Sequence, residues 1–251
     1  MSTHTVRHEG AELRYELRGE GPLLVLIAGR GGDGARYTRL AERLAGSHAV
    51  LTYDRQRRAT GFDMGQQARD TAAIIHAARP RAPRAAVFGQ GGGGSVAFEL
   101  AAHLPDLVTE LVVHEAPTIT LLPDAPKWLS HAREVHATHA RRGTAAALAL
   151  TDIDPADFAD QAEADAFLAR EFLAMALYTP DLDAVRRSGI PVVTAAGEKS
   201  RDTCHDQAAR VQAEHLACRY TRFPGGHHGF ESDVDAFAPA LATTLAELRR
   251  P

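Results

Sequence analysis

The glycine-rich segment at residues 85–104, AAVFGQGGGGSVAFELAAHL, constrains the fold more than any other part of the chain. Residues 85–88 form an apolar run typical of a buried strand, and apolar residues from 96 to 104 recur at helical spacing. A strand must therefore turn directly into a helix across the glycines. Gly91, at the centre of that turn, accepts a left-handed backbone that a side chain would strain. The segment predicts a tight strand–turn–helix unit with Gly91 at its tip.

Strand and helix patterns alternate through most of the chain. Apolar and alternating runs predict strands at 5–8, 13–18, 23–27, 49–53, 85–88, 111–115, 190–195 and 218–223. Apolar residues at helical spacing predict helices at 37–44, 66–78 and 237–248. Alternation of this kind is typical of an α/β fold with a mostly parallel sheet, flanked by helices and joined by right-handed crossovers.

Residues 121–188 interrupt the alternation with helical patterns alone. We expect this insertion to be a helical lid, and residues 1–120 and 189–251 to form the core domain. Two aromatic residues of the lid, Trp128 and Tyr178, are candidates for lining an apolar substrate pocket. The helices expected within the lid span 128–141, 145–150, 162–178 and 182–187.

Length and composition exclude several classes of function. A chain of 251 residues with 45% hydrophobic residues suits one α/β domain with an insertion. The formal net charge of -4, with arginines scattered among acidic residues, argues against a nucleic-acid partner. The chain lacks both a membrane-length apolar run and a signal-peptide pattern, so we expect a cytoplasmic protein with no membrane partner. Cys204 and Cys218 fit neither a disulfide framework nor a metal knuckle, and nothing indicates the oligomeric state.

Three motifs together resemble the α/β-hydrolase superfamily over nearly the whole chain. They are the glycine-rich turn around Gly91, the sequence YDRQR at 53–57, and the sequence FPGGHHGF at 223–230. The resemblance implies the α/β-hydrolase fold, with a helical cap where the lid is expected. It also implies that Gly91 occupies the place of the serine in the G-x-S-x-G nucleophile elbow. Ser95 is no obvious replacement, because it lies about one helical turn, ~6 Å, below the tip.

The same resemblance implies roles for residues around the turn. His227, after the last strand, takes the place of the catalytic base, and the adjacent His228 is its alternative. The backbone N–H groups of Arg30 and Gly92 take the place of the oxyanion hole. Two further residues are then expected to line the substrate site: Gly29 and Gln90.

Three carboxylates are candidates for the acid that partners His227. Glu115 ends a buried strand at the carboxyl edge of the sheet, where a carboxylate needs a partner to offset its desolvation. Asp202 and Glu198 lie in the later loop where the superfamily usually supplies its acid, although Ser200 stands at the expected position. We rank Glu115 first, with Asp202 as the other principal candidate.

Two further patterns suggest different chemistry. The sequence GRGGDG at 29–34 matches the dinucleotide fingerprint G-x-G-x-x-G, with Asp54 in position to bind a ribose hydroxyl. The glycine-rich turn matches the same spacing, which favours glycine abundance over phosphate binding as the source of both matches. His131, His136 and His139 do not form a ligand pair at this spacing, so no metal and no cofactor is expected.

Without a side-chain nucleophile at residue 91, no acyl-enzyme can form there. The leading hypothesis is an enzyme that uses non-covalent acid–base chemistry of His227, with an oxyanion hole, on a small and largely apolar carbonyl compound. Hydrolysis, carbon–carbon cleavage, elimination and cyclisation all fit. Three alternatives stay open: a non-catalytic protein that binds a small ligand, a serine hydrolase with an introduced serine-to-glycine change, and a dinucleotide-binding enzyme.

Overall fold

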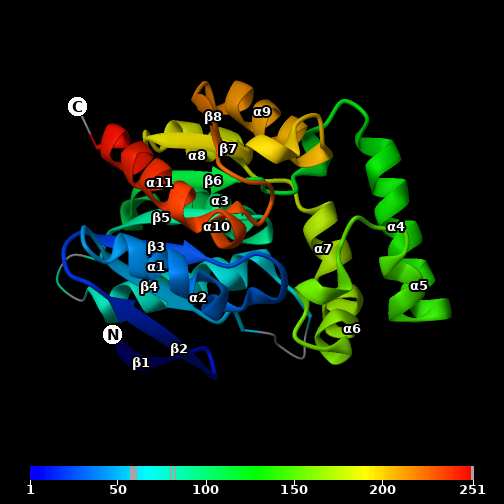
Figure 1. Cartoon of the computed structure of the whole chain (residues 1–251), viewed down its shortest axis with the longest axis horizontal. Helices are drawn as coiled ribbons and strands as arrows, with labels where there is room; N and C mark the ends of the chain where they lie inside the picture. The colour runs from blue at the N-terminus through cyan, green and yellow to red at the C-terminus, as the bar shows by residue number, and fades with distance from the viewer. Residues whose placement is uncertain (57–60, 80, 82, 250–251) are drawn as a thin grey trace.

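The structure is a computed structural model that describes residues 1–56, 61–79, 81 and 83–249. Within this part of the chain, one sheet has the strand order β1-β2-β4-β3-β5-β6-β7-β8 (Figure 1). Strands β3 to β8 run parallel, whereas β2 pairs antiparallel with both β1 and β4. The expected α/β fold with a mostly parallel sheet is thus confirmed. The strands are β1 (Ser2–His8), β2 (Ala11–Arg18), β3 (Leu23–Ile27), β4 (Ala49–Tyr53), β5 (Ala85–Gln90), β6 (Val108–His114), β7 (Val192–Gly197) and β8 (Arg219–Phe223).

The carboxyl ends of β3, β5 and β6 lie side by side in the middle of the sheet. In the register of the parallel pairs, Ile27 of β3 is beside Gly89 of β5, and Gln90 of β5 is beside His114 of β6. Parallel strands end at the same edge of a sheet, and the loops that follow them gather there. Residues that follow β3, β5 and β6 in the sequence are therefore neighbours in space.

The sheet separates two apolar cores, because side chains alternate between its faces. Val25 and Val87 belong to the core shared with α2, α3 and α8, while Leu26 and Phe88 belong to the core shared with α1 and α11. All four side chains are fully buried. The helices that cover the sheet are α1 (Thr38–Leu44), α2 (Met64–Ala78), α3 (Gly92–His103), α8 (Leu182–Arg187), α9 (Cys204–Leu216), α10 (Gly229–Ser232) and α11 (Val234–Leu248).

Helices α4 to α7 form a separate layer beside the sheet (Figure 1). Their apolar side chains make a third cluster, which includes Val135, Phe167 and Met175. Helix α8 instead places Leu182 and Val185 in the core against the sheet, so the separate layer ends before α8. Within the described residues, no helix has the length and apolar character needed to cross a membrane. The helices of the layer are α4 (Ala125–Arg142), α5 (Thr144–Leu148), α6 (Gln161–Arg170) and α7 (Phe172–Leu177).

The expectation of one continuous helix at 162–178 is wrong, because the chain breaks at Glu171 between α6 and α7. The side chain of Glu171 is buried, and its carboxylate lies 3.1 Å from the Arg55 guanidinium. The break thus coincides with an ion pair between residues far apart in the sequence. Apolar spacing continues through residue 171 and therefore gives no sign of it.

Phe237→Ala should lower the free energy of unfolding by about 3–5 kcal/mol, because it opens a cavity in a buried aromatic cluster. Phe237 lies on α11 and its ring contacts those of Phe88, Phe223 and His114. Leu248→Ala is the control on the same helix, since Leu248 is only partly buried at the helix end. Denaturant unfolding measures both losses, and equal losses would contradict this description of the core.

Candidate active site

The chain turns between β5 and α3 at Gly91, which has φ of 54° and ψ of -128°. This positive φ lies in the left-handed region that favours glycine. The Gly91 N–H donates to the His114 carbonyl at 2.9 Å, and the Gly91 carbonyl accepts from the Gly94 N–H at 2.9 Å. Gly93 is required for a different reason, which is close packing: a Cβ there would lie 2.1 Å from the Ile27 carbonyl oxygen. The glycines therefore allow α3 to begin directly against β3.

His227 lies over this turn. A Cβ built on Gly91 would be 3.3 Å from His227 Nε2 and 3.9 Å from Gly29 Cα. His227 follows β8, and its side chain keeps 30% of its surface exposed. The gap between the imidazole and the Gly91 backbone is therefore about wide enough for one side-chain atom.

Glu115 is the partner of His227 in the structure. His227 Nδ1 donates to Glu115 Oε2 at 2.7 Å. The other carboxylate oxygen accepts the Gly197 N–H at 2.7 Å, and the Ser200 hydroxyl also bonds to this carboxylate. Burial raises the pKa of Glu115, but the hydrogen bond from His227 and the neighbouring donors outweigh burial and hold that pKa well below its usual range. Glu115 is therefore ionised at neutral pH.

Gln90 determines which nitrogen of His227 carries the proton. Its side-chain Nε2 lies 2.8 Å from His227 Nε2 and 3.1 Å from the His227 carbonyl oxygen. A carbonyl only accepts, so this amide nitrogen donates, and His227 Nε2 is an acceptor. The proton of the neutral ring is then on Nδ1, facing Glu115. Burial lowers the pKa of His227 to about 4, although the hydrogen bond to Glu115 acts in the opposite direction.

Two backbone N–H groups next to the turn come from Gly92, which begins α3, and from Arg30, which begins the short helix η1 (Arg30–Gly32). In the described part of the chain, neither N–H has a hydrogen-bond partner. Met175 of α7 covers Gly92, since a Cβ there would lie 2.6 Å from Met175 Cε. The helical layer therefore reaches to within contact distance of the turn.

Arg55 holds the loop that carries Arg30 through hydrogen bonds to two of its carbonyl groups. Its Nε donates to the Ala28 carbonyl at 2.9 Å, and its Nη2 donates to the Gly29 carbonyl at 2.5 Å. The same guanidinium pairs with Glu171 of the helical layer, and both side chains are almost fully buried. One buried cation thus joins the loop after β3 to the break between α6 and α7.

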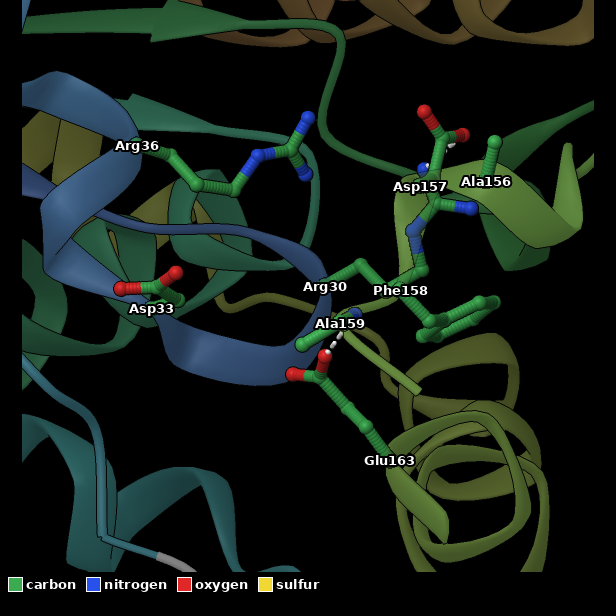
Figure 2. A pocket seen from close by; sticks show the side chains of 8 residues that line it. All are labelled: Arg30, Asp33, Arg36, Ala156, Asp157, Phe158, Ala159 and Glu163. Atoms are coloured by element: carbon green, nitrogen blue, oxygen red, sulfur yellow. Dashed lines mark hydrogen bonds and ion pairs between the residues drawn. The ribbon is translucent and has the colours of Figure 1, made fainter. Parts of the chain in front are cut away.

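The side chain of Arg30 crosses from its loop to the segment before α6 (Figure 2). It donates to Asp157 at 2.7 Å and contacts His228 Nε2 at 3.0 Å, so His228 pairs with arginine rather than with the turn. Beside it lies a cavity of about 210 Å³. Among the described residues, His227 is not part of its lining. The lining residues are Arg30, Asp33, Arg36, Ala156, Asp157, Phe158, Ala159 and Glu163.

The other two carboxylate candidates lie apart from His227. Asp202 is exposed before α9, where its backbone N–H donates to Asp206 Oδ2 at 3.0 Å. Glu198 is exposed in the turn after β7. The expectation that Asp202 joins the site is corrected, because the carboxylate that accepts from His227 Nδ1 follows β6 instead.

Trp128 and Tyr178, the aromatic residues expected to line a pocket, form hydrogen bonds with residues other than His227. Trp128 donates through its indole N–H to Asp124 of its own helix region at 3.0 Å. The Tyr178 hydroxyl donates at 2.7 Å to Glu99, which lies two turns along α3 from the glycines. Their polar contacts thus join them to α4 and to α3, and within the described residues none joins them to the histidine.

The loop at 29–34 does not offer Asp54 to a nucleotide, because Asp54 bonds the loop's own backbone. Asp54, which a dinucleotide site would offer to a ribose, accepts the Gly34 N–H at 2.9 Å. A Cβ at Gly29 would lie 2.6 Å from Gln90 Oε1, so the loop packs directly on the side chain that meets His227. Arg57, the last residue of the YDRQR motif, lies outside the described residues.

Several residues of the site carry no clear sequence signal. Met175 and Arg55 act through contacts with distant segments, which local patterns do not reveal. Ser200 could have been found from the sequence, because it stands where the superfamily usually has its acid. In the structure its hydroxyl contacts Glu115, the carboxylate that follows β6. His205 also lies against His227, with ring centroids 4.6 Å apart. Ser95 is buried, and its hydroxyl has no partner among the described residues.

Glu171→Ala should lower the free energy of unfolding by about 3–5 kcal/mol, because it leaves the charge of Arg55 buried without this partner. Glu171→Gln should lose less, because its amide oxygen can still accept a hydrogen bond from the Arg55 guanidinium, which keeps its bonds to the Ala28 and Gly29 carbonyls. Denaturant unfolding of the two variants and the parent measures this. A Glu171→Gln variant less stable than Glu171→Ala would contradict this account of the pair.

Comparisons with known proteins agree with this architecture. The model of the alpha/beta hydrolase family matches residues 24–240. An uncharacterised hydrolase of Bacillus subtilis, YraK, is 24% identical over 100% of this chain and 98% of its own length. A putative carbamate hydrolase of Azorhizobium caulinodans, RutD, is 35% identical over 41% of this chain and 40% of its own. The structure of a thermophilic esterase from Thermogutta terrifontis has a TM-score of 0.76 at 18% identity and covers 100% of both chains. The chain therefore belongs to the alpha/beta hydrolase family.

Proposed function

We propose that this protein is an enzyme that acts on a small, largely apolar carbonyl compound through non-covalent acid–base chemistry of His227. One observation carries the proposal: Glu115 holds Nδ1 of His227, and Nε2 lies 3.3 Å from where a Cβ of residue 91 would be. A neutral imidazole oriented by a carboxylate is the general base of many hydrolytic enzymes. Here the base faces a glycine instead of a nucleophile.

In this proposal His227 removes a proton from water or from the substrate. The proton enters at Nε2, and the resulting imidazolium keeps its Nδ1–H bond to the ionised carboxylate of Glu115. Gln90 donates to Nε2 in the resting state, so its amide must turn aside or be exchanged for the reacting group. The space over Gly91, free of a hydroxymethyl group, is where a water with polar partners would stand.

The backbone N–H groups of Arg30 and Gly92 are the proposed oxyanion hole. Both lack partners among the described residues, and Gly92 begins a helix, where the dipole favours negative charge. The helical layer α4 to α7 is the proposed cap. Met175 gives the site an apolar surface over Gly92, while Gly29 and Gln90 form its inner wall. The proposed substrate therefore has a polar carbonyl end and an apolar remainder.

The relatives' names support hydrolysis over the other reactions that this machinery allows. Their names are an uncharacterised hydrolase, a putative carbamate hydrolase and an esterase, and carbamates and esters are carbonyl compounds whose hydrolysis develops an oxyanion. We therefore propose hydrolysis of a small ester, carbamate or lactone, with water as the nucleophile that His227 activates.

His227→Ala should lower kcat by about 10²–10⁴-fold, because it removes the general base. The assay measures by mass spectrometry the alcohols, acids and amines released from a panel of small esters, carbamates and lactones. His215→Ala is the matched control, since His215 is an exposed histidine on α9. Turnover by His227→Ala equal to that of the parent would overturn the proposed role.

A second candidate, a protein that binds a small ligand without turnover, is favoured by the contact of Gln90 with His227 Nε2. That hydrogen bond occupies the nitrogen that a base must have free. In this case a ligand would raise the melting temperature of the parent and of His227→Ala equally, and neither would hydrolyse any member of the panel.

Gly91→Ser and Gly91→Ala should each lower turnover of the natural substrate at least ~10-fold, because both fill the space beside His227 and strain a left-handed backbone. The two variants differ by one oxygen atom. A burst of p-nitrophenol from p-nitrophenyl acetate with the serine variant alone would show instead that the chain is a serine hydrolase that has lost its nucleophile.

A further inference from the structure

Glu115, His205 and His227 bring three metal-binding side chains together beside the Gly91 turn. One ligand atom from each residue lies within 4.8 Å of the other two. The two histidines are partly buried and Glu115 is fully buried. His205 has no part in the proposed acid–base chemistry, and packing alone does not require an imidazole against another imidazole.

The position of His205 is set by the start of α9. Thr203 is the N-cap of this helix, and its side chain accepts from the Asp206 N–H. His205 follows in the first turn, with its ring tilted by 39° to that of His227 at a centroid distance of 4.6 Å. Nδ1 of His205 lies 3.7 Å from Cys204 Sγ, which leaves Nε2 for another partner. Metal-binding histidines usually have their second nitrogen hydrogen-bonded, most often to a carboxylate, a carbonyl or water, and here the partner is a thiol.

We propose that Glu115, His205 and His227 bind a divalent transition-metal ion of the Zn²⁺ type. Two imidazole nitrogens and a carboxylate oxygen are a ligand set that such an ion accepts, with a position left for water. Metal–ligand distances of about 2.0–2.2 Å in tetrahedral geometry place the ligand atoms roughly 3.4 Å apart, so the side chains need only small shifts. The N–H of Gly197 and the Ser200 hydroxyl already hold the carboxylate.

The ion would enter between Glu115 and His227 in place of the proton that they share. His227 Nδ1 lies 2.7 Å from the carboxylate, so it is the nitrogen that binds the metal. The ring then keeps its single proton on Nε2, and Gln90, which donates there in the metal-free site, has to turn away. Resting on the proposed function, this means that the bound ion inhibits turnover, because Nε2 no longer accepts a proton.

Isothermal titration calorimetry with zinc chloride tests the site on the full chain without a polyhistidine tag. The parent should bind one ion, and His205→Gln should bind it at least ten-fold more weakly. His215→Gln is the matched control, because it makes the same change at an exposed position of α9 and should bind as the parent does. Magnesium chloride should give no comparable heat, since Mg²⁺ prefers oxygen ligands.

Anomalous diffraction at the zinc edge from soaked crystals gives a second reading that needs no variant. A peak between Glu115 and His205 is expected. Absence of that peak, or equal zinc affinity of His205→Gln and the parent, overturns the proposal. Calorimetry does not depend on turnover, so a protein that binds zinc but hydrolyses nothing would refute the proposed function and leave the metal site standing.

Discussion

The hydrogen bond between Glu115 and His227 is the interaction on which the site depends. An ionised carboxylate at the end of a buried strand is stable only when donors replace the water that it loses. The imidazole supplies one donor, and the loop after β7 supplies the Gly197 N–H and the Ser200 hydroxyl. The loops that follow β6, β7 and β8 therefore converge on one carboxylate, which fixes the imidazole over the turn at the end of β5.

Features set by local sequence were predictable. The strands at 23–27 and 49–53 and the helix at 182–187 have the bounds expected from their apolar patterns, and the turn at Gly91 has the left-handed backbone that its glycine suggested. These elements follow from the residues within them. The α/β-hydrolase fold followed from their order together with three motifs.

Features set by distant contacts were not predictable. Residue order offered Glu115, Asp202 and Glu198 as acids and ranked Glu115 first only because it ends a buried strand. Loop conformation determines which carboxylate reaches the imidazole, and the sequence does not contain it. The break at Glu171 coincides with an ion pair to Arg55, and His205 at the start of α9 contacts His227, which follows β8. None of these partners is adjacent in sequence, so no local pattern contains the information.

Arg30 links two regions of the molecule. Its backbone lies in the loop after β3, beside the Gly91 turn, and its guanidinium donates to Asp157 in the segment before α6. The segment 155–158 is therefore tied to the loop that follows β3 and not only to the helices around it. Exposed positions of α4 have no part in this contact, whereas Asp157 holds the guanidinium that extends from the loop after β3. A short stretch at the edge of the helical layer is thus part of the support for the end of β3, although it is more than 100 residues away in the sequence.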